Sequence, residues 1–202
     1  MLGKNNPRSC CRLVWLTAVL LLAGTTVSAV CRADEPAPPS LDSRAEEAIR
    51  GLTSEDAYVR QRSFLQLEAL RNPASVDSIR PFVDNKDEDM RAWSLRALVA
   101  IQGAAVIPLL RERAQSDKEP SVRRAALLGL EPLAAADPTL VQFFVDRLSE
   151  RSPEVRMTAV DIVSRIQDPV ARSAVRERAK HEGNRDVRKV LAAALQRIGP
   201  AE

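Results

Sequence analysis

The sequence predicts an all-α protein, an α-solenoid of about five antiparallel helix pairs. The first observation behind this prediction is a dipeptide, Val or Met followed by Arg, that recurs five times at spacings of 31, 32, 33 and 32 residues. Self-similarity at one period in this range is typical of stacked repeats. The second observation is composition: aromatic residues make up only 3% of the chain, and small and aliphatic residues that suit closely packed helices are abundant. The third is that strand-like alternation of β-branched and polar residues is absent.

The N-terminal 33 residues are typical of a secretory signal peptide. Lys4, Arg8 and Arg12 precede an apolar run at 13–23, and small residues follow it. This order of a basic, an apolar and a small-residue region is the pattern that export machinery recognises and removes. The chain is therefore expected to be exported, to the periplasm or the medium.

The expected cleavage site lies after Ala33, or alternatively after Ala29, because both end a small-x-small triplet. Two other interpretations stay open. Residues 13–30 would form a membrane anchor if they were not cleaved, although this run is short and diluted by Gly and Thr. Cys31 would be lipidated in a lipoprotein, although the preceding Val30 is a poor match to such a site.

A proline-rich linker at 34–40 is expected to separate the signal from the body, since its three prolines exclude a helix interior. All three cysteines lie within the first 33 residues, so the body has no disulfide, thiolate metal site or cysteine nucleophile. A chain that begins at Asp34 has 26 basic and 27 acidic residues. This near-neutral balance argues against nucleic-acid binding, which needs a basic face, and against a polybasic membrane patch.

The body, 41–202, divides into five units at about 41–72, 73–103, 104–136, 137–167 and 168–200. In each unit the second helix is expected to begin three residues before the recurring Val or Met. That position mostly holds a side chain that can accept a hydrogen bond from the first helical turn. Pro120 and Pro153 follow it in two units, at the position where proline is favoured. The expected N-cap residues are Asp56, Asp87, Glu119, Ser152 and Asn184.

Within each second helix an apolar stripe recurs at positions 0, +4, +8 and +11 from the Val or Met, close to the helical period. The residue at +4 is small in four units, which should let a neighbouring helix approach. First helices of the pairs are expected at 42–52, 75–84, 104–116, 138–150 and 169–181, with bends at Pro81 and Pro108.

These patterns resemble the HEAT-repeat family, and more narrowly its short version in phycobilisome-lyase-like proteins. The resemblance is carried by the turns Glu119-Pro-Ser-Val-Arg and Ser152-Pro-Glu-Val-Arg, the small residue four positions on and the Leu eight positions on. It covers residues 41–199 and implies two antiparallel helices in each repeat. Members of this family serve as scaffolds, adaptors, lyases and nucleic-acid enzymes, so the resemblance fixes the fold more closely than the function.

An arginine follows the Val or Met in every unit. We interpret this column as a structural ladder in which each arginine pairs with the capping residue of the next repeat, since a residue shared by all units serves the stacking that they share. The alternative is a row of anion-binding sites. The column consists of Arg60, Arg91, Arg123, Arg156 and Arg188.

Few residues are candidates for catalysis or metal binding. His181 is the only histidine and is interpreted as a solvated loop residue, because no cysteine or second histidine of the body can complete a site with it. The acidic run at 84–89 lacks the glycine and distal glutamate of a calcium loop, so it is interpreted as a helix-capping turn. No catalytic residue, cofactor or metal is expected.

Residues that differ between repeats are the better candidates for binding. Trp93 lies outside the apolar stripe, and Arg62 and Arg96 lie near it in the repeat pattern. If the second helices line the inner surface, as the resemblance implies, these three form a partner-binding patch of the composition that interface hot spots favour. The alternative for Trp93 is that it fills space between repeats.

The sequence is thus interpreted as an exported, non-catalytic interaction scaffold that holds a protein partner on its concave face. Such a protein is not an enzyme, binds no nucleic acid and has no stable membrane insertion in its mature form. The alternative is a lyase-type enzyme of the phycobilisome-lyase-like group, whose members act on cytosolic partners. A nucleic-acid-binding HEAT protein is the third interpretation.

Overall fold

The structure is a computed structural model that describes residues 40–199. The predicted signal peptide, 1–33, and nearly all of the predicted linker lie outside the described residues. Every regular element of the described part is a helix, and the helices follow one another as antiparallel pairs. The prediction of an all-α solenoid is therefore confirmed.

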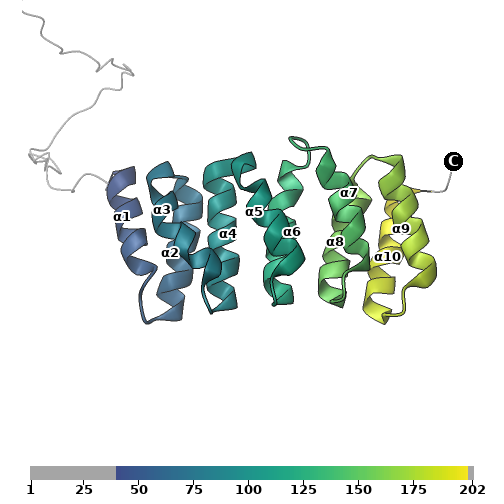
Figure 1. The fold of residues 1–202 in the computed structure, drawn as a ribbon, viewed down its shortest axis with the longest axis horizontal. Coiled ribbons are helices and arrows are strands. Elements are labelled where there is room, and N and C mark those ends of the chain that lie inside the picture. Colours follow the sequence, from purple (N-terminus) through teal and green to yellow (C-terminus); the bar gives the residue numbers. More distant parts are fainter. Residues whose placement is uncertain (1–39, 200–202) are drawn as a thin grey trace, which may run out of the picture. The chain divides into compact units, whose positions relative to one another are not determined.

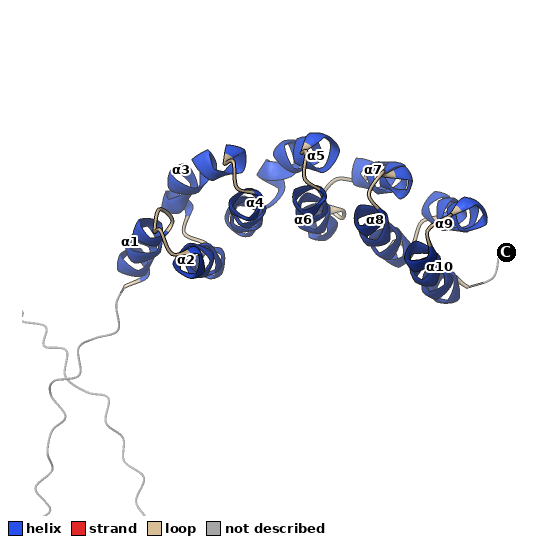
Figure 2. Ribbon diagram, turned by 90° about the horizontal axis from the view of Figure 1, so that it is seen from below, coloured by secondary structure: helices blue, strands red, loops and turns tan. Residues whose placement is uncertain are grey.

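The described part contains five helix pairs arranged in two layers. Figure 1 shows the pairs side by side in chain order, and Figure 2 shows an arc with the second helix of each pair on its inner side. The outer layer consists of α1 (Leu41–Gly51), α3 (Val76–Ile79), α5 (Ile107–Ser116), α7 (Thr139–Asp146) and α9 (Pro169–His181). The inner layer consists of α2 (Ala57–Leu70), α4 (Glu88–Gln102), α6 (Pro120–Leu130), α8 (Pro153–Arg165) and α10 (Arg185–Ile198).

The outer helices are less regular than the inner ones. The helix expected at 75–84 is only the four-residue α3, and 3₁₀ turns at Pro73–Ser75 and Arg80–Asp84 flank it. Pro81 lies in the second of these turns, where the regular helix has already ended. The expected bend at Pro108 is wrong, because Pro108 lies in the first turn of α5. At this position its missing N–H costs no hydrogen bond.

The capping side chains act as expected in three of the five inner helices. Asp56, Asp87 and Asn184 accept hydrogen bonds from backbone N–H groups of the first turn. Glu119 and Ser152 make no such bond. Both precede a proline, and the inner helix nevertheless begins at the same point of the repeat. The start of the helix therefore depends on more than the capping side chain.

Small residues at position +4 lie where helices approach each other most closely. Ser63, Ser94, Ala126 and Ala159 are all buried. A Cβ atom added to Gly51, at the end of α1, would lie 2.1 Å from Oγ of Ser63 and 3.3 Å from its Cβ. The core between the layers is otherwise filled by aliphatic side chains such as Leu67, Leu98, Leu127 and Leu130, which are fully buried.

One described stretch, Glu88–Ser116, is long and apolar enough to cross a membrane by length and composition. It contains two helices of different layers, because Gly103 ends α4 with a φ of 57° and a 3₁₀ turn leads into α5. Leu98 and Leu110, one from each helix, are fully buried within the solenoid. The apolar character of this stretch thus reflects its place in the core of the repeats.

Candidate functional site

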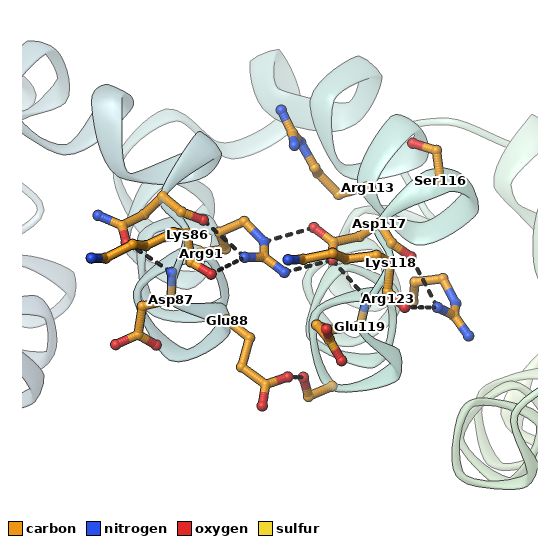
Figure 3. A network of polar contacts seen from close by, with 12 residues as sticks. Lys86, Asp87, Glu88, Arg91, Arg113, Ser116, Asp117, Lys118, Glu119 and Arg123 are labelled. Carbon is orange, nitrogen blue, oxygen red and sulfur yellow. Dashed lines mark hydrogen bonds and ion pairs between the residues drawn. The ribbon is translucent and has the colours of Figure 1, made fainter.

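The arginine column forms hydrogen bonds along one edge of the solenoid, at the turns between outer and inner helices. Arg91 is the clearest case (Figure 3). Its Nε and Nη2 donate to the two carboxylate oxygens of Asp117 in the next repeat, both at 2.9 Å. Its Nη1 donates to the carbonyls of Asn85 and Lys86 in its own turn, at 2.8 and 3.2 Å. One side chain thus joins two successive turns.

The same arrangement recurs one and two repeats later. Arg123 donates from Nη2 to Oε1 of Glu150 at 2.9 Å. Arg156 donates from Nε and Nη2 to the two carboxylate oxygens of Glu182, both at 3.0 Å. Both arginines also bind the carbonyls of their own turns. The three carboxylates are almost fully buried, with side-chain exposures of 3%, 7% and 1% for Asp117, Glu150 and Glu182.

The two terminal arginines of the column differ from the three internal ones. Arg60 donates to the carbonyls of Ser54 and Glu55, at 2.9 and 2.8 Å, and Arg188 donates to that of Gly183 at 3.0 Å. Within residues 40–199 neither of them has a carboxylate partner. For Arg60, the corresponding position of the next repeat holds Asn85 in place of an acid.

The partner of each internal arginine lies two residues earlier than the sequence analysis expected. Of the three capping residues expected as partners, Asn184 accepts hydrogen bonds from the backbone N atoms of Asp186 and Val187, and the hydroxyl of Ser152 donates to Glu154. The earlier carboxylate instead accepts from the backbone N of the capping residue, as Asp117 does from Glu119 at 3.0 Å. Its remaining lone pairs face the arginine of the preceding repeat. The column Asp117, Glu150 and Glu182, five residues before each Val, was visible in the sequence and would have revealed this register.

The surroundings of Asp117 and Glu182 favour the charged forms of these two carboxylates. Burial would raise the pKa of Glu182, but hydrogen bonds from Arg156, the backbone N of Asn184 and Arg178 outweigh it and lower the pKa to about 2. In Asp117 burial is likewise outweighed, mainly by the hydrogen bond from Arg91, and the pKa is lowered. The pKa of Arg91 is raised by the same hydrogen bond. Both carboxylates therefore stay charged at neutral pH.

The inner surface of the arc carries a hollow of about 500 Å³, which we call the first hollow. It is lined by residues from the end of α2, from α4 and from α6. Those that matter most below are Arg71, Trp93, Arg96, Arg124 and Leu128. A volume of this size lies in the range of ligand-binding sites.

A second hollow of about 570 Å³ lies over α6, α8 and α10. It includes Asp161, Lys189 and Arg197, and it shares Arg124 and Leu128 with the first hollow. The two hollows are therefore neighbours on either side of these α6 side chains, and together we call them the concave groove.

Two of the three residues of the expected partner-binding patch line this groove. Trp93 and Arg96 belong to the first hollow, whereas Arg62 is exposed on α2 and lines neither hollow. Trp93 also contacts the buried Phe64, with ring centroids 6.2 Å apart, so it both fills space between repeats and faces the hollow. Arg96 pairs with Glu68 at 3.1 Å.

Two arginines of the first hollow were not singled out from the sequence. Arg124 occupies position +2 of its helix, in a column that includes Gln61, Ala92 and Met157, and this variability was the available signal. Arg71 follows α2 in a left-handed conformation with φ 51°, which no sequence pattern indicated.

The remaining candidates lie apart from the groove. The Nε2 atom of His181 lies 3.0 Å from Oε1 of Glu177, and both side chains are exposed. Asp87 of the acidic run at 84–89 caps α4. Among the described residues, no three His, Cys, Asp or Glu side chains are placed to hold a metal ion.

Comparison with protein-family models identifies two matching segments, 45–131 and 114–196, both to HEAT repeats. Together they span most of the chain. The chain belongs to the HEAT-repeat family. The helix pairs described above are thus the repeats of a HEAT solenoid.

Among curated proteins, this HEAT protein is 43% identical over 68 residues to a phycobilisome maturation protein of Synechococcus elongatus. The match covers 34% of the chain and 32% of that relative, so the chain spans about a third of the relative's length. Among solved structures, it resembles a chain of the CpcE and CpcF complex of phycocyanin lyase from Nostoc sp. PCC7120. This likeness has a TM-score of 0.61 at 20% identity and covers 76% of the chain and 98% of the other. An engineered protein matches with a TM-score of 0.47 at 17% identity, over 76% of the chain and 78% of its own.

These relatives correct the functional interpretation of the sequence. The expectation of a non-catalytic scaffold, and with it the statement that the HEAT protein is not an enzyme, is wrong, because the relatives are a maturation protein and a lyase. The error had a physical cause. The absence of a nucleophile or metal set argues only against catalysis by this chain's own reactive groups, whereas a protein can also accelerate a reaction by positioning its substrates.

Replacing Arg91 with Ala should destabilise the HEAT protein by about 3–5 kcal/mol, because Asp117 would keep a buried charge without its partner. The matched control is Arg96→Ala in the same helix, whose partly exposed pair with Glu68 should contribute less than about 1 kcal/mol. Urea unfolding followed by circular dichroism measures both. Equal losses of stability would contradict the role assigned to the buried pair.

The low pKa of Glu182 predicts a loss of stability in acid. Since the folded-state pKa of about 2 lies below the ordinary 4.5, the contribution is complete above about pH 5 and is lost as the pH falls toward 2. Its size is on the order of 3 kcal/mol. At neutral pH the variant Glu182→Gln should be less stable than the parent chain. Between about pH 5 and pH 2 it should lose less stability than the parent chain loses. Unfolding curves over this interval measure the difference, and identical pH profiles would refute the assignment.

Proposed function

We propose that this HEAT protein is a lyase-type maturation factor that acts on a protein substrate carrying an attached chromophore. In this role the chain binds its substrate on the concave groove and orients it while the chromophore is attached or removed. The observation that carries the proposal is the 43% identity over 68 residues with the phycobilisome maturation protein. The likeness to the phycocyanin lyase complex supports the fold required for it.

The residues of the groove fit a positioning role. Trp93 and Leu128 offer apolar contact surface, and Leu128 is 43% exposed. Arg124 lies where the two hollows meet, and arginine side chains can hold a carboxylate of a substrate or of its chromophore. Residues 40–199 contain no cysteine, so the described part of the chain offers no thiol to the chromophore. What the described part of the chain contributes is binding and orientation, which alone can account for a large acceleration.

The proposal also includes a protein partner. The related lyase was solved as a complex of CpcE with CpcF. The concave groove extends from α2 to α10, and a surface of this length suits a folded protein better than a small molecule alone.

A chromophore-transfer assay tests the function. The purified chain is incubated with chromophore-bearing phycocyanin and with chromophore-free phycocyanin plus free chromophore. The expected result is an increased rate of detachment or attachment, read from visible absorbance and from colour retained on the protein after denaturation. Trp93→Ala should reduce that rate by about tenfold, because it removes the aromatic side chain that lines the first hollow.

The matched control for the assay is Arg62→Gln, which removes an exposed arginine outside both hollows and should leave the rate unchanged. Rates that do not exceed the protein-free reaction in either direction would overturn the proposed function. If Arg62→Gln lowered the rate as much as Trp93→Ala does, the substrate would bind outside the concave groove.

We further propose that residues 1–33 direct export and are cleaved after Ala33 or Ala29. The support is the order of basic, apolar and small residues in this segment. An exported member of the family would act on a substrate outside the cytosol.

N-terminal sequencing of the protein purified from its own cells tests the export proposal. A chain that begins at Asp34 or Val30 is the expected result. An intact N-terminus in the soluble cytosolic fraction would refute export, and a fatty-acylated Cys31 would replace it with the lipoprotein interpretation.

A further inference from the structure

The first hollow carries an excess of positive charge that the described part of the chain does not neutralise. Its ionisable lining consists of Arg71, Arg96, Arg124 and Glu68. Glu68 is engaged by Arg96, at 3.1 Å. Arg71 and Arg124 have neither an ion pair nor a side-chain hydrogen bond among residues 40–199. The hollow therefore has two guanidinium groups available for an anionic ligand.

The backbone at Arg71 has an uncommon conformation for a residue with a side chain. It is the only residue other than glycine with a positive φ among the described residues. Its left-handed conformation closes α2 through a hydrogen bond from its backbone N to the carbonyl of Leu67 at 3.1 Å. Glycine or asparagine is the usual residue here, because a side chain in this conformation is strained. Strain at such a position is commonly kept where the side chain serves a site.

Apolar groups surround the two arginines. Trp93, Leu128 and Val99 line the same hollow, and Leu128 is one of the few large apolar side chains that the described residues leave exposed. A small inorganic anion would pair with the arginines and leave these groups in contact with water. A ligand that combines negative charge with apolar side chains satisfies both parts of the lining.

The presence of a second hollow beside the first favours a polypeptide segment as the ligand, since such a segment is long enough to contact both. Beyond Arg124 the second hollow contains both acidic and basic residues, and there Arg197 pairs with Asp161 at 3.2 Å and Lys189 with Asp186 at 2.7 Å. Unneutralised positive charge is thus concentrated at the α4 and α6 end. The polypeptide that complements this distribution of charge has acidic residues at one end and neutral or mixed residues toward the other.

We propose that the first hollow binds a segment of a partner protein that carries two carboxylate side chains next to an apolar one, with Arg71 and Arg124 as their counter-ions. The inference rests on the proposed function in that the partner is the substrate whose maturation the chain serves. It adds to that function the chemical feature by which the substrate is recognised.

Selection from a random peptide library displayed on phage, with the full mature chain as the target, tests the inference. The enriched peptides should contain two acidic residues next to a large apolar one. Their affinity, measured by fluorescence anisotropy with labelled synthetic copies, should weaken with added salt, because the contacts are partly exposed ion pairs. Arg71→Gly and Arg124→Gln should each weaken binding about threefold to fivefold, and together about tenfold.

Arg71→Gly is informative because glycine suits the left-handed backbone, so the variant should fold with an unchanged or higher Tm. Arg62→Gln serves as the control and should bind the peptides as the parent chain does. The inference is overturned if no peptide is enriched, if the enriched peptides lack acidic residues, or if both hollow variants bind them with parental affinity. No chromophore takes part in this measurement, so the inference and the proposed function can fail separately.

Discussion

The stacking of this solenoid depends on an arginine that is shared between two turns. Apolar contacts between inner helices would allow a range of sliding and rotation, since aliphatic side chains impose little directionality. The bidentate contact of Arg91 with Asp117, and the corresponding contact of Arg156 with Glu182, permits one geometry only. Each arginine also binds the carbonyls of its own turn. It therefore fixes the position of that turn relative to the turn of the next repeat. These contacts link the repeats from α4 to α10, whose inner helices line most of the groove.

Residues that all repeats share and residues that differ between repeats have different roles in this solenoid. Residues present in every repeat are used for capping, for close helix approach and for the edge contacts. The groove is built from positions where the repeats differ, such as Trp93, Arg124 and Leu128. A repeat protein can therefore acquire a specific site without disturbing its stacking, provided that the changes stay on the inner helices' exposed positions.

The fold could be predicted from the sequence because each inner helix carries its own start signal and apolar stripe, and five imperfect copies reinforce one another. The partner of the arginine column was placed two residues too late, because capping propensity does not reveal that the carboxylate before the cap already faces the previous turn. Trp93 and Arg96 could be placed in the candidate site from their departure from the stripe. Arg71 could not, since its contribution depends on a left-handed backbone that local sequence did not indicate. The non-catalytic interpretation was wrong because it was drawn from missing reactive residues, and a protein that acts by positioning its substrates needs none of its own.

The joint between the first two inner helices has a consequence for mechanics. Arg60 binds only its own turn, and Asn85 stands where later repeats have a buried acid, so α2 and α4 lack the buried ion pair that joins the later helices. In a chain of nearest-neighbour interfaces, the weakest interface opens first. The first hollow takes Glu68 and Arg71 from one side of this joint and Trp93 and Arg96 from the other. Occupation of the hollow would therefore add contacts across this joint and would hold the first repeat more firmly against the rest of the array.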